Sequence, residues 1–164
     1  TTMKKIIFTL ALIFAVTVVS AQDNPFEKFT DMDGVTSVFI SKNMMALFPK
    51  DSNQFGGVSI NSFVDKLSSI LILTTENKKV GQEMLSLANS RIKTNNYELL
   101  MRVKSDDGEN VNFYMKGKPE NIQELIMIVD GDDDESVIMQ FLGNFKLEDV
   151  QNMTKEFKKQ NNMQ

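Results

Sequence analysis

The chain has 164 residues, with 18 basic and 22 acidic residues and neither cysteine nor histidine. This length suits one domain, and an acidic balance disfavours binding to nucleic acid or anionic lipid. The missing residue types exclude disulfides, thiol chemistry, the Ser-His-Asp relay and the commonest zinc ligands, so we predict no cofactor and no enzymatic activity.

The N-terminus has the pattern of a secretory signal peptide. Two lysines follow Met3, an apolar run covers residues 6–19, and small residues precede Gln22. The apolar run is shorter than the ~20 residues that a membrane-spanning helix needs. We predict that residues 1–21 are a signal peptide, with two extra residues before Met3. Cleavage between Ala21 and Gln22 would release a periplasmic or secreted protein that is not an integral membrane protein.

The first half of the remaining chain predicts two strands and several helices. Residues 22–33 are a polar lead-in in which Phe26 and Phe29 can form one helical turn. A single domain is then expected over residues 34–159. It begins with a strand at 35–40 and a short helix at 42–48 that Ser41 caps. A loop at 50–57, a short helix near 60–67 and a buried strand at 69–74 follow.

The second half predicts a long helix and four strands. Apolar residues at helical spacing mark a helix at 76–94, for which Thr75 can serve as the cap. Residues 97–143 read as four strands with alternating apolar positions, and Asp107-Gly108 suits a hairpin turn. The run 125–129 is apolar on both faces and suits a central strand. An amphipathic helix begins near Leu147, and residues 160–164 should fray.

This order of elements predicts an α+β fold, a two-layer sandwich of helices packed on a sheet. The strand-helix-strand unit at the front implies parallel neighbours, and the four later strands imply an antiparallel meander. The sheet is therefore expected to be mixed, with a C-terminal helix.

An acidic loop raises the question of a metal site. Asp130, Asp132 and Asp134 have the first three ligand spacings of a calcium-binding EF-hand loop. However, Glu135 stands where glycine is needed, and Phe141 stands where a bidentate glutamate belongs. A solvated hairpin loop is the preferred interpretation, and these residues remain weak candidates for a cation site.

Each of the four later strands contains one methionine: Met101, Met115, Met127 and Met139. Thioethers can bind copper(I), but methionine at inward positions fills a core, and we prefer the core interpretation. Two other sets could bind a partner or ligand. A possible partner surface is the outward row Glu98, Arg102, Lys104, Asn112, Tyr114 and Lys116, and a possible ligand-groove rim is Met44, Met45, Gly56 and Gly57.

The residues 35–49, 66–76 and 97–150 resemble a family of small exported proteins of the Bacteroidota, designated domain of unknown function 4252. The resemblance implies an α+β domain of the cell envelope, and it supplies no catalytic residues. Some relatives are lipoproteins, but this chain lacks the cysteine that lipid attachment requires. Relatives are often encoded near alternative sigma factors, which implies a role in envelope stress or signalling.

Three hypotheses about function follow. The first is a non-enzymatic module that binds another envelope protein, since export, the absent catalytic side chains and a polar sheet face all suit that role. The second is a carrier for a small ligand or lipid, held between sheet and helices. The third, which we rank last, is a hydrolase that uses carboxylates or a Ser-Lys pair.

Overall fold

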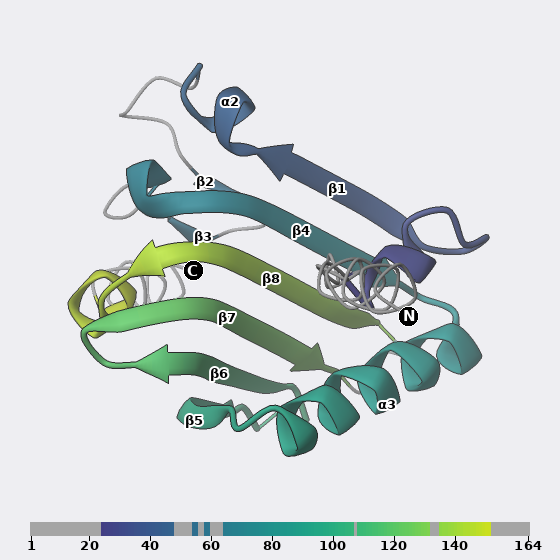
Figure 1. Ribbon diagram of the computed structural model, residues 1–164. Coiled ribbons are helices and arrows are strands. Elements are labelled where there is room, and N and C mark those ends of the chain that lie inside the picture. The colour runs from purple at the N-terminus through teal and green to yellow at the C-terminus, as the bar shows by residue number, and fades with distance from the viewer. Residues whose placement is uncertain are drawn as a thin grey trace, which may run out of the picture.

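The computed structural model describes residues 24–47, 54–55, 58–59, 64–106, 108–131 and 135–151. A sheet of six strands dominates this part of the chain, in the spatial order β1-β4-β8-β7-β6-β5 (Figure 1). Its strands are β1 (Thr36–Ser41), β4 (Leu67–Thr75), β5 (Glu98–Lys104), β6 (Asn110–Lys118), β7 (Asn121–Asp130) and β8 (Ser136–Phe145). The predicted α+β class and the meander of the last four strands are confirmed.

The predicted mixed sheet is wrong, because every neighbouring pair of strands is antiparallel. Helix α2 (Lys42–Met45) has only four residues and rises about 6 Å, whereas β4 is about 30 Å long. It therefore cannot return the chain to the starting end of β1, as a parallel neighbour would require. The chain instead continues through the hairpin of β2 (Gln54–Phe55) and β3 (Val58–Ser59), and through the 3-10 turn η2 (Val64–Lys66), into an antiparallel β4.

The long helix α3 (Lys78–Thr94) makes the one long crossover of the described chain. It follows β4 and runs across one face of the sheet to β5 at the far edge (Figure 1). The meander then leads back, and β8 pairs with β4. β4 and β5 consequently point the same way but are separated by three strands.

The helix caps are partly as expected. The Ser41 hydroxyl oxygen accepts a hydrogen bond from the Met44 N–H at 3.3 Å, which confirms the predicted cap of α2. Helix α3 is capped by Asn77, whose Oδ1 accepts from the N–H groups of the next turn, and not by Thr75. The Thr75 hydroxyl donates to the Gly34 carbonyl at 2.6 Å, and its oxygen accepts from the Asn77 N–H at 3.1 Å, one residue before the helix begins.

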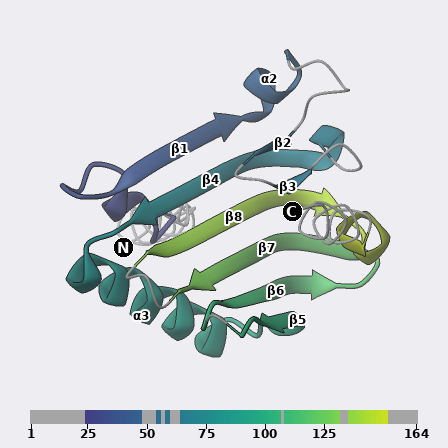
Figure 2. The same ribbon diagram turned by 180° about the vertical axis from the view of Figure 1, so that it is seen from behind.

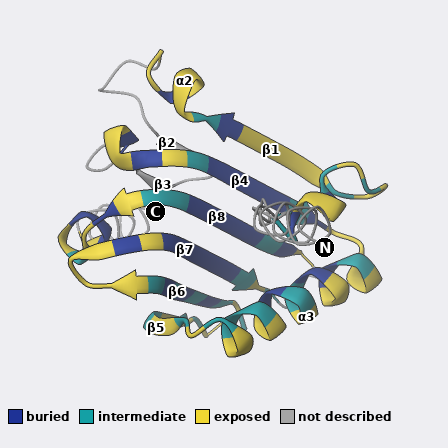
Figure 3. Cartoon of the chain, in the orientation of Figure 1, coloured by how far each residue is buried: buried dark blue, intermediate teal, exposed yellow. Residues whose placement is uncertain are grey.

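Two hydrophobic clusters lie on the two faces of the sheet. Figure 3 shows that β7 and β8, in the middle of the sheet, are buried over most of their length. The cluster on the face away from α3 includes Phe113 and Phe141, together with three of the four strand methionines, Met115, Met127 and Met139. These methionines are at most 5% exposed, and Met101 packs against the same cluster. The core interpretation of the methionines is therefore confirmed.

The second cluster lies beneath α3 and includes the segment that sequence reasoning treated as a lead-in. Phe26 and Phe29, at the 3-10 turn η1 (Glu27–Phe29), are fully buried in the same cluster as Met84 and Ala88 of α3 and Leu73 of β4. This segment thus packs as part of the domain. At the other end of the described chain, residues 147–151 are helical, where the C-terminal helix was expected to begin.

Candidate functional site

A β-bulge in β5 divides the polar row that was predicted as a partner surface. The register shifts between Leu99 and Met101, so that Leu99 pairs with Tyr114 while Glu98 pairs with Met115. Because paired residues share a face, Glu98 lies on the methionine face of the sheet, away from α3. The shift also explains why Leu100 interrupts the alternation, since it packs against the cluster that contains Met115.

The other five residues of the row lie on the α3 face but do not form one surface. The Arg102 Nε donates to the Asn112 Oδ1 at 2.8 Å, across the pair β5–β6, and Lys104 is exposed beyond them. Tyr114 packs against the cluster beneath α3. Lys116 instead borders a hollow next to α3.

A second bulge, in β7, shapes this hollow. Lys116 pairs with Glu124 and Gly117 pairs with Ile122, which leaves Gln123 without an opposing residue on β6. Gly117 has a φ of +123°, and a Cβ at this position would collide with the Asn121 carbonyl oxygen. Bulges redirect side chains, and both Gln123 and Glu124 line the hollow as a result.

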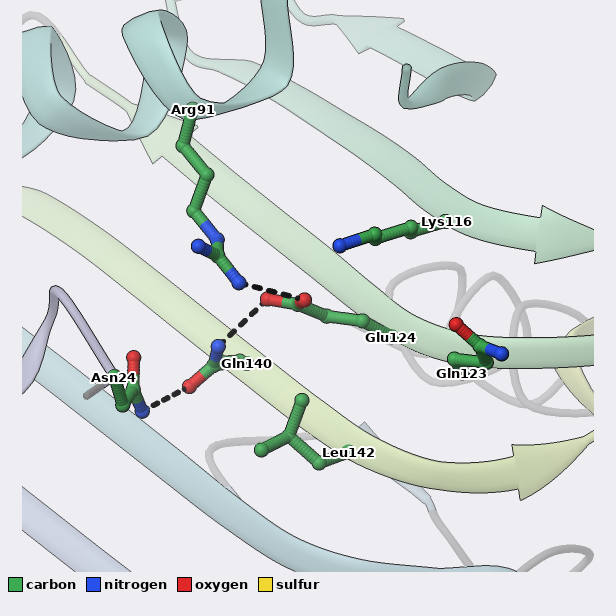
Figure 4. Close-up of a pocket in the computed structure, with 7 residues that line it drawn as sticks. All are labelled: Asn24, Arg91, Lys116, Gln123, Glu124, Gln140 and Leu142. Carbon is green, nitrogen blue, oxygen red and sulfur yellow. Dashed lines mark hydrogen bonds and ion pairs between the residues drawn. The ribbon is translucent and has the colours of Figure 1, made fainter. Parts of the chain in front are cut away.

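The hollow has a volume of about 220 Å³ and lies beside α3 (Figure 4). Residues from the N-terminal segment, the helix and three strands meet there. Its lining consists of Asn24, Arg91, Lys116, Gln123, Glu124, Gln140 and Leu142.

A chain of hydrogen bonds forms one wall of the hollow. The Glu124 carboxylate, whose side chain is 5% exposed, accepts from Arg91 Nη2 at 3.0 Å and from Gln140 Nε2 at 2.6 Å. Gln140 Oε1 in turn accepts from Asn24 Nδ2 at 2.6 Å. The buried carboxylate is therefore held by a cation and an amide, as a buried charge requires.

Tyr97, which lies between the end of α3 and the start of β5, extends this network. Arg91 Nε donates to the Tyr97 hydroxyl oxygen at 3.0 Å. Burial raises the pKa of Tyr97 far above its ordinary value, and the Glu124 carboxylate adds to that shift. Burial alone would lower the pKa of Arg91, but its hydrogen bond to Glu124 and the carboxylate charge outweigh burial and raise it. At neutral pH Tyr97 is thus neutral and Arg91 is charged.

A second feature lies at the opposite side of the sheet, along β1 and α2. Val38, Phe39, Met44 and Leu47 are 43%, 66%, 49% and 77% exposed, and with Leu99 they are the exposed large hydrophobic residues of the described chain. Figures 1 and 2 show β1 at the sheet edge, and Figure 3 shows it exposed over most of its length. No described strand pairs with its outer side.

The other two predicted sites lie only partly within the described residues. Met45 is buried at 3% exposure while its neighbour Met44 is exposed, and Gly56 and Gly57 lie outside the described residues. Asp130 is exposed at the end of β7, and Asp132 and Asp134 also lie outside the described residues. Within the described ranges, no group of three His, Cys, Asp or Glu side chains could hold a metal ion. No described helix has both the length and the apolar character needed to cross a membrane.

Sequence reasoning identified Lys116 but missed the rest of the hollow. The usable signal was a polar residue at an inward position of an apolar strand. Gln140 lies between Met139 and Phe141, and Glu124 directly precedes the apolar run of β7. Such residues need a buried partner, although the sequence does not say which one.

The described residues thus form a small α+β domain with a polar hollow beside α3 and an exposed apolar edge at β1. The chain belongs to the family Domain of unknown function (DUF4252), whose model matches residues 27–153. No curated protein and no solved structure matches the chain.

Proposed function

We propose that this chain is a non-enzymatic protein-binding module of the cell envelope, which binds its partner along β1. The observation that carries the proposal is the concentration of exposed apolar side chains on β1, on α2 and on the turn after α2, at an edge that no described strand covers. Edge strands can pair with an added strand, and a soluble domain usually blunts such an edge with charges. β1 has the sequence TSVFIS and carries no charge.

The partner proposed for this edge is an extended segment of another exported protein. Its backbone would pair with β1 as an added strand. Phe39 lies on the α3 face and Val38 on the opposite face, because their partners Leu71 and Ile72 belong to the two different clusters. A segment with apolar residues on both faces would therefore cover both side chains. A role in envelope stress or signalling belongs to the same proposal and is supported by the family resemblance alone.

The test is site-specific photocrosslinking in the native cells. A photoreactive phenylalanine analogue replaces Phe39, and a matched control carries it at Leu99, which is 46% exposed on the opposite edge strand. We expect one partner to be captured from Phe39 and not from Leu99. A second variant carries the analogue at Val38 with Phe39→Lys, and capture should then be lost.

Two results would contradict the proposal. Capture of the same proteins from Phe39 and Leu99 would mean that the β1 edge has no selectivity. A crosslinked dimer formed by the purified chain alone would assign the edge to a second copy instead of a different partner. N-terminal sequencing of the recovered protein tests export, with Gln22 expected as the first residue.

A further inference from the structure

We propose that the hollow beside α3 is a binding site for a carboxylate group, with Lys116 and Arg91 as its cationic partners. Nothing in the family assignment or in the function proposed for β1 requires this site. It lies on the α3 side of the sheet near β6 and β7, whereas the apolar edge is at β1.

The first argument is the balance of charge. Arg91 and Lys116 are the cations that line the hollow, and Glu124 is the one anion. Arg91 Nη2 and Gln140 Nε2 already satisfy the Glu124 carboxylate. In Figure 4 the Lys116 ammonium points from β6 toward Arg91 and Glu124, yet among the described residues it forms no hydrogen bond or ion pair. One positive charge therefore remains uncompensated, which favours an occupant with a single negative charge.

The second argument is the set of hydrogen-bond donors. The Lys116 ammonium lies 5.9 Å from the centre of the Tyr97 ring, which orients it without using its three N–H groups. Gln123 presents an amide from the bulge, and Arg91 has N–H groups beyond the two that bind Tyr97 and Glu124. A planar carboxylate can accept from an ammonium and an amide at once.

The third argument concerns size and the nature of competing anions. A volume of about 220 Å³ holds the equivalent of about seven water molecules, since each takes about 30 Å³ in the liquid. That is room for the end of a short acid or of a peptide, with Leu142 as the apolar wall. A phosphate dianion would bring a second negative charge close to Glu124 with no further cation to balance it.

The experiment is an NMR titration of the full chain at constant ionic strength, with sodium chloride as the reference. The probes are sodium butyrate, which carries a single carboxylate, sodium phosphate, the tetrapeptide Ala-Ala-Ala-Ala with a free C-terminus, and the same peptide as its C-terminal amide. We expect saturable shifts at Lys116, Gln123 and Arg91 with at least one of the two carboxylates and none with the amide. Preference for butyrate would indicate a free acid as the ligand, and preference for the tetrapeptide would indicate a chain terminus.

The variant Lys116→Gln should weaken binding at least tenfold, as expected for loss of a charge-assisted hydrogen bond. The matched control is Lys118→Gln, which removes the same charge from the same strand but lies outside the hollow. It should leave affinity within about twofold, because an exposed charge beyond the site acts only weakly through solvent. Three results would each overturn the proposal. The first is equal loss of affinity in both variants, and the second is no saturable binding by any carboxylate. The third is inorganic phosphate binding as tightly as the carboxylates. Phe39→Lys should not alter this binding, so failure here and failure of the β1 proposal are distinguishable.

Discussion

Removal of the Arg91 guanidinium should destabilise the fold much more than the loss of an exposed ion pair. The Arg91 and Glu124 side chains are 19% and 5% exposed, and their ion pair measures 3.0 Å. In Arg91→Met the aliphatic stem is kept, but the buried carboxylate loses the cation that is paired with it and keeps only neutral partners such as the Gln140 amide. Breaking a buried pair on one side costs about 3–5 kcal/mol. Because the hollow gives Glu124 some access to water, we expect about 3 kcal/mol.

The assay is urea unfolding followed by circular dichroism, supported by thermal unfolding. A loss of about 3 kcal/mol corresponds to a fall in Tm of roughly 10 °C for a domain of this size. The double variant Arg91→Met with Glu124→Gln should recover about 1–3 kcal/mol relative to Arg91→Met alone, because the neutral amide no longer needs a cation.

The matched control is Glu83→Gln, which breaks the ion pair between Lys28 and Glu83. That pair measures 2.8 Å, but its side chains are 47% and 51% exposed, so its loss should cost less than about 1 kcal/mol. If Arg91→Met costs no more than Glu83→Gln, the Glu124 carboxylate is solvated through the hollow and the reasoning from burial is wrong.

Four further predictions concern the fold. Met127→Ala should lower the free energy of unfolding by about 2–5 kcal/mol in urea titrations while Met127→Leu costs less than about 1.5 kcal/mol, and equal effects would argue against a packing role. Phe29→Ala should cost about 3–5 kcal/mol in the same titration, whereas a lead-in without packing would cost almost nothing. Asn77→Ala should lower the free energy of unfolding by about 1 kcal/mol and Asn77→Asp by much less, as measured by thermal unfolding. Equal losses in the two variants would show that the side chain of residue 77 does not stabilise α3 as a cap. Burial alone would raise the pKa of Asp149, but the hydrogen bonds that it accepts from Lys66 and from a backbone N–H outweigh burial and lower the pKa. The ionised Asp149 therefore stabilises the fold above its unfolded pKa of about 3.9, and this stabilisation is lost as pH falls through its folded pKa. In Asp149→Asn the free energy of unfolding should consequently fall less steeply as the pH is lowered over this range, as measured by urea unfolding at several pH values.

The sequence by itself determined the features that depend on neighbouring residues. Alternation with a period of two identified the strands of the meander and the buried positions of Met115, Met127 and Met139, because adjacent side chains in a strand point to opposite faces. The helical spacing of apolar residues predicted α3, and Ser41, a residue type that caps helices through a local hydrogen bond, predicted the start of α2. Each of these signals lies within a few residues of the element that it predicts.

Only the tertiary structure decided how these elements pair. The antiparallel pairing of β1 with β4 and the pairing of β8 with β4 depend on contacts between residues far apart in the chain. The bulges that turn Glu98 away from Arg102 and leave Gln123 unopposed depend on register across neighbouring strands, which a periodic pattern does not encode. For the same reason the hollow could not be predicted, since its cations and its carboxylate come from different elements and meet only when α3 crosses the finished sheet.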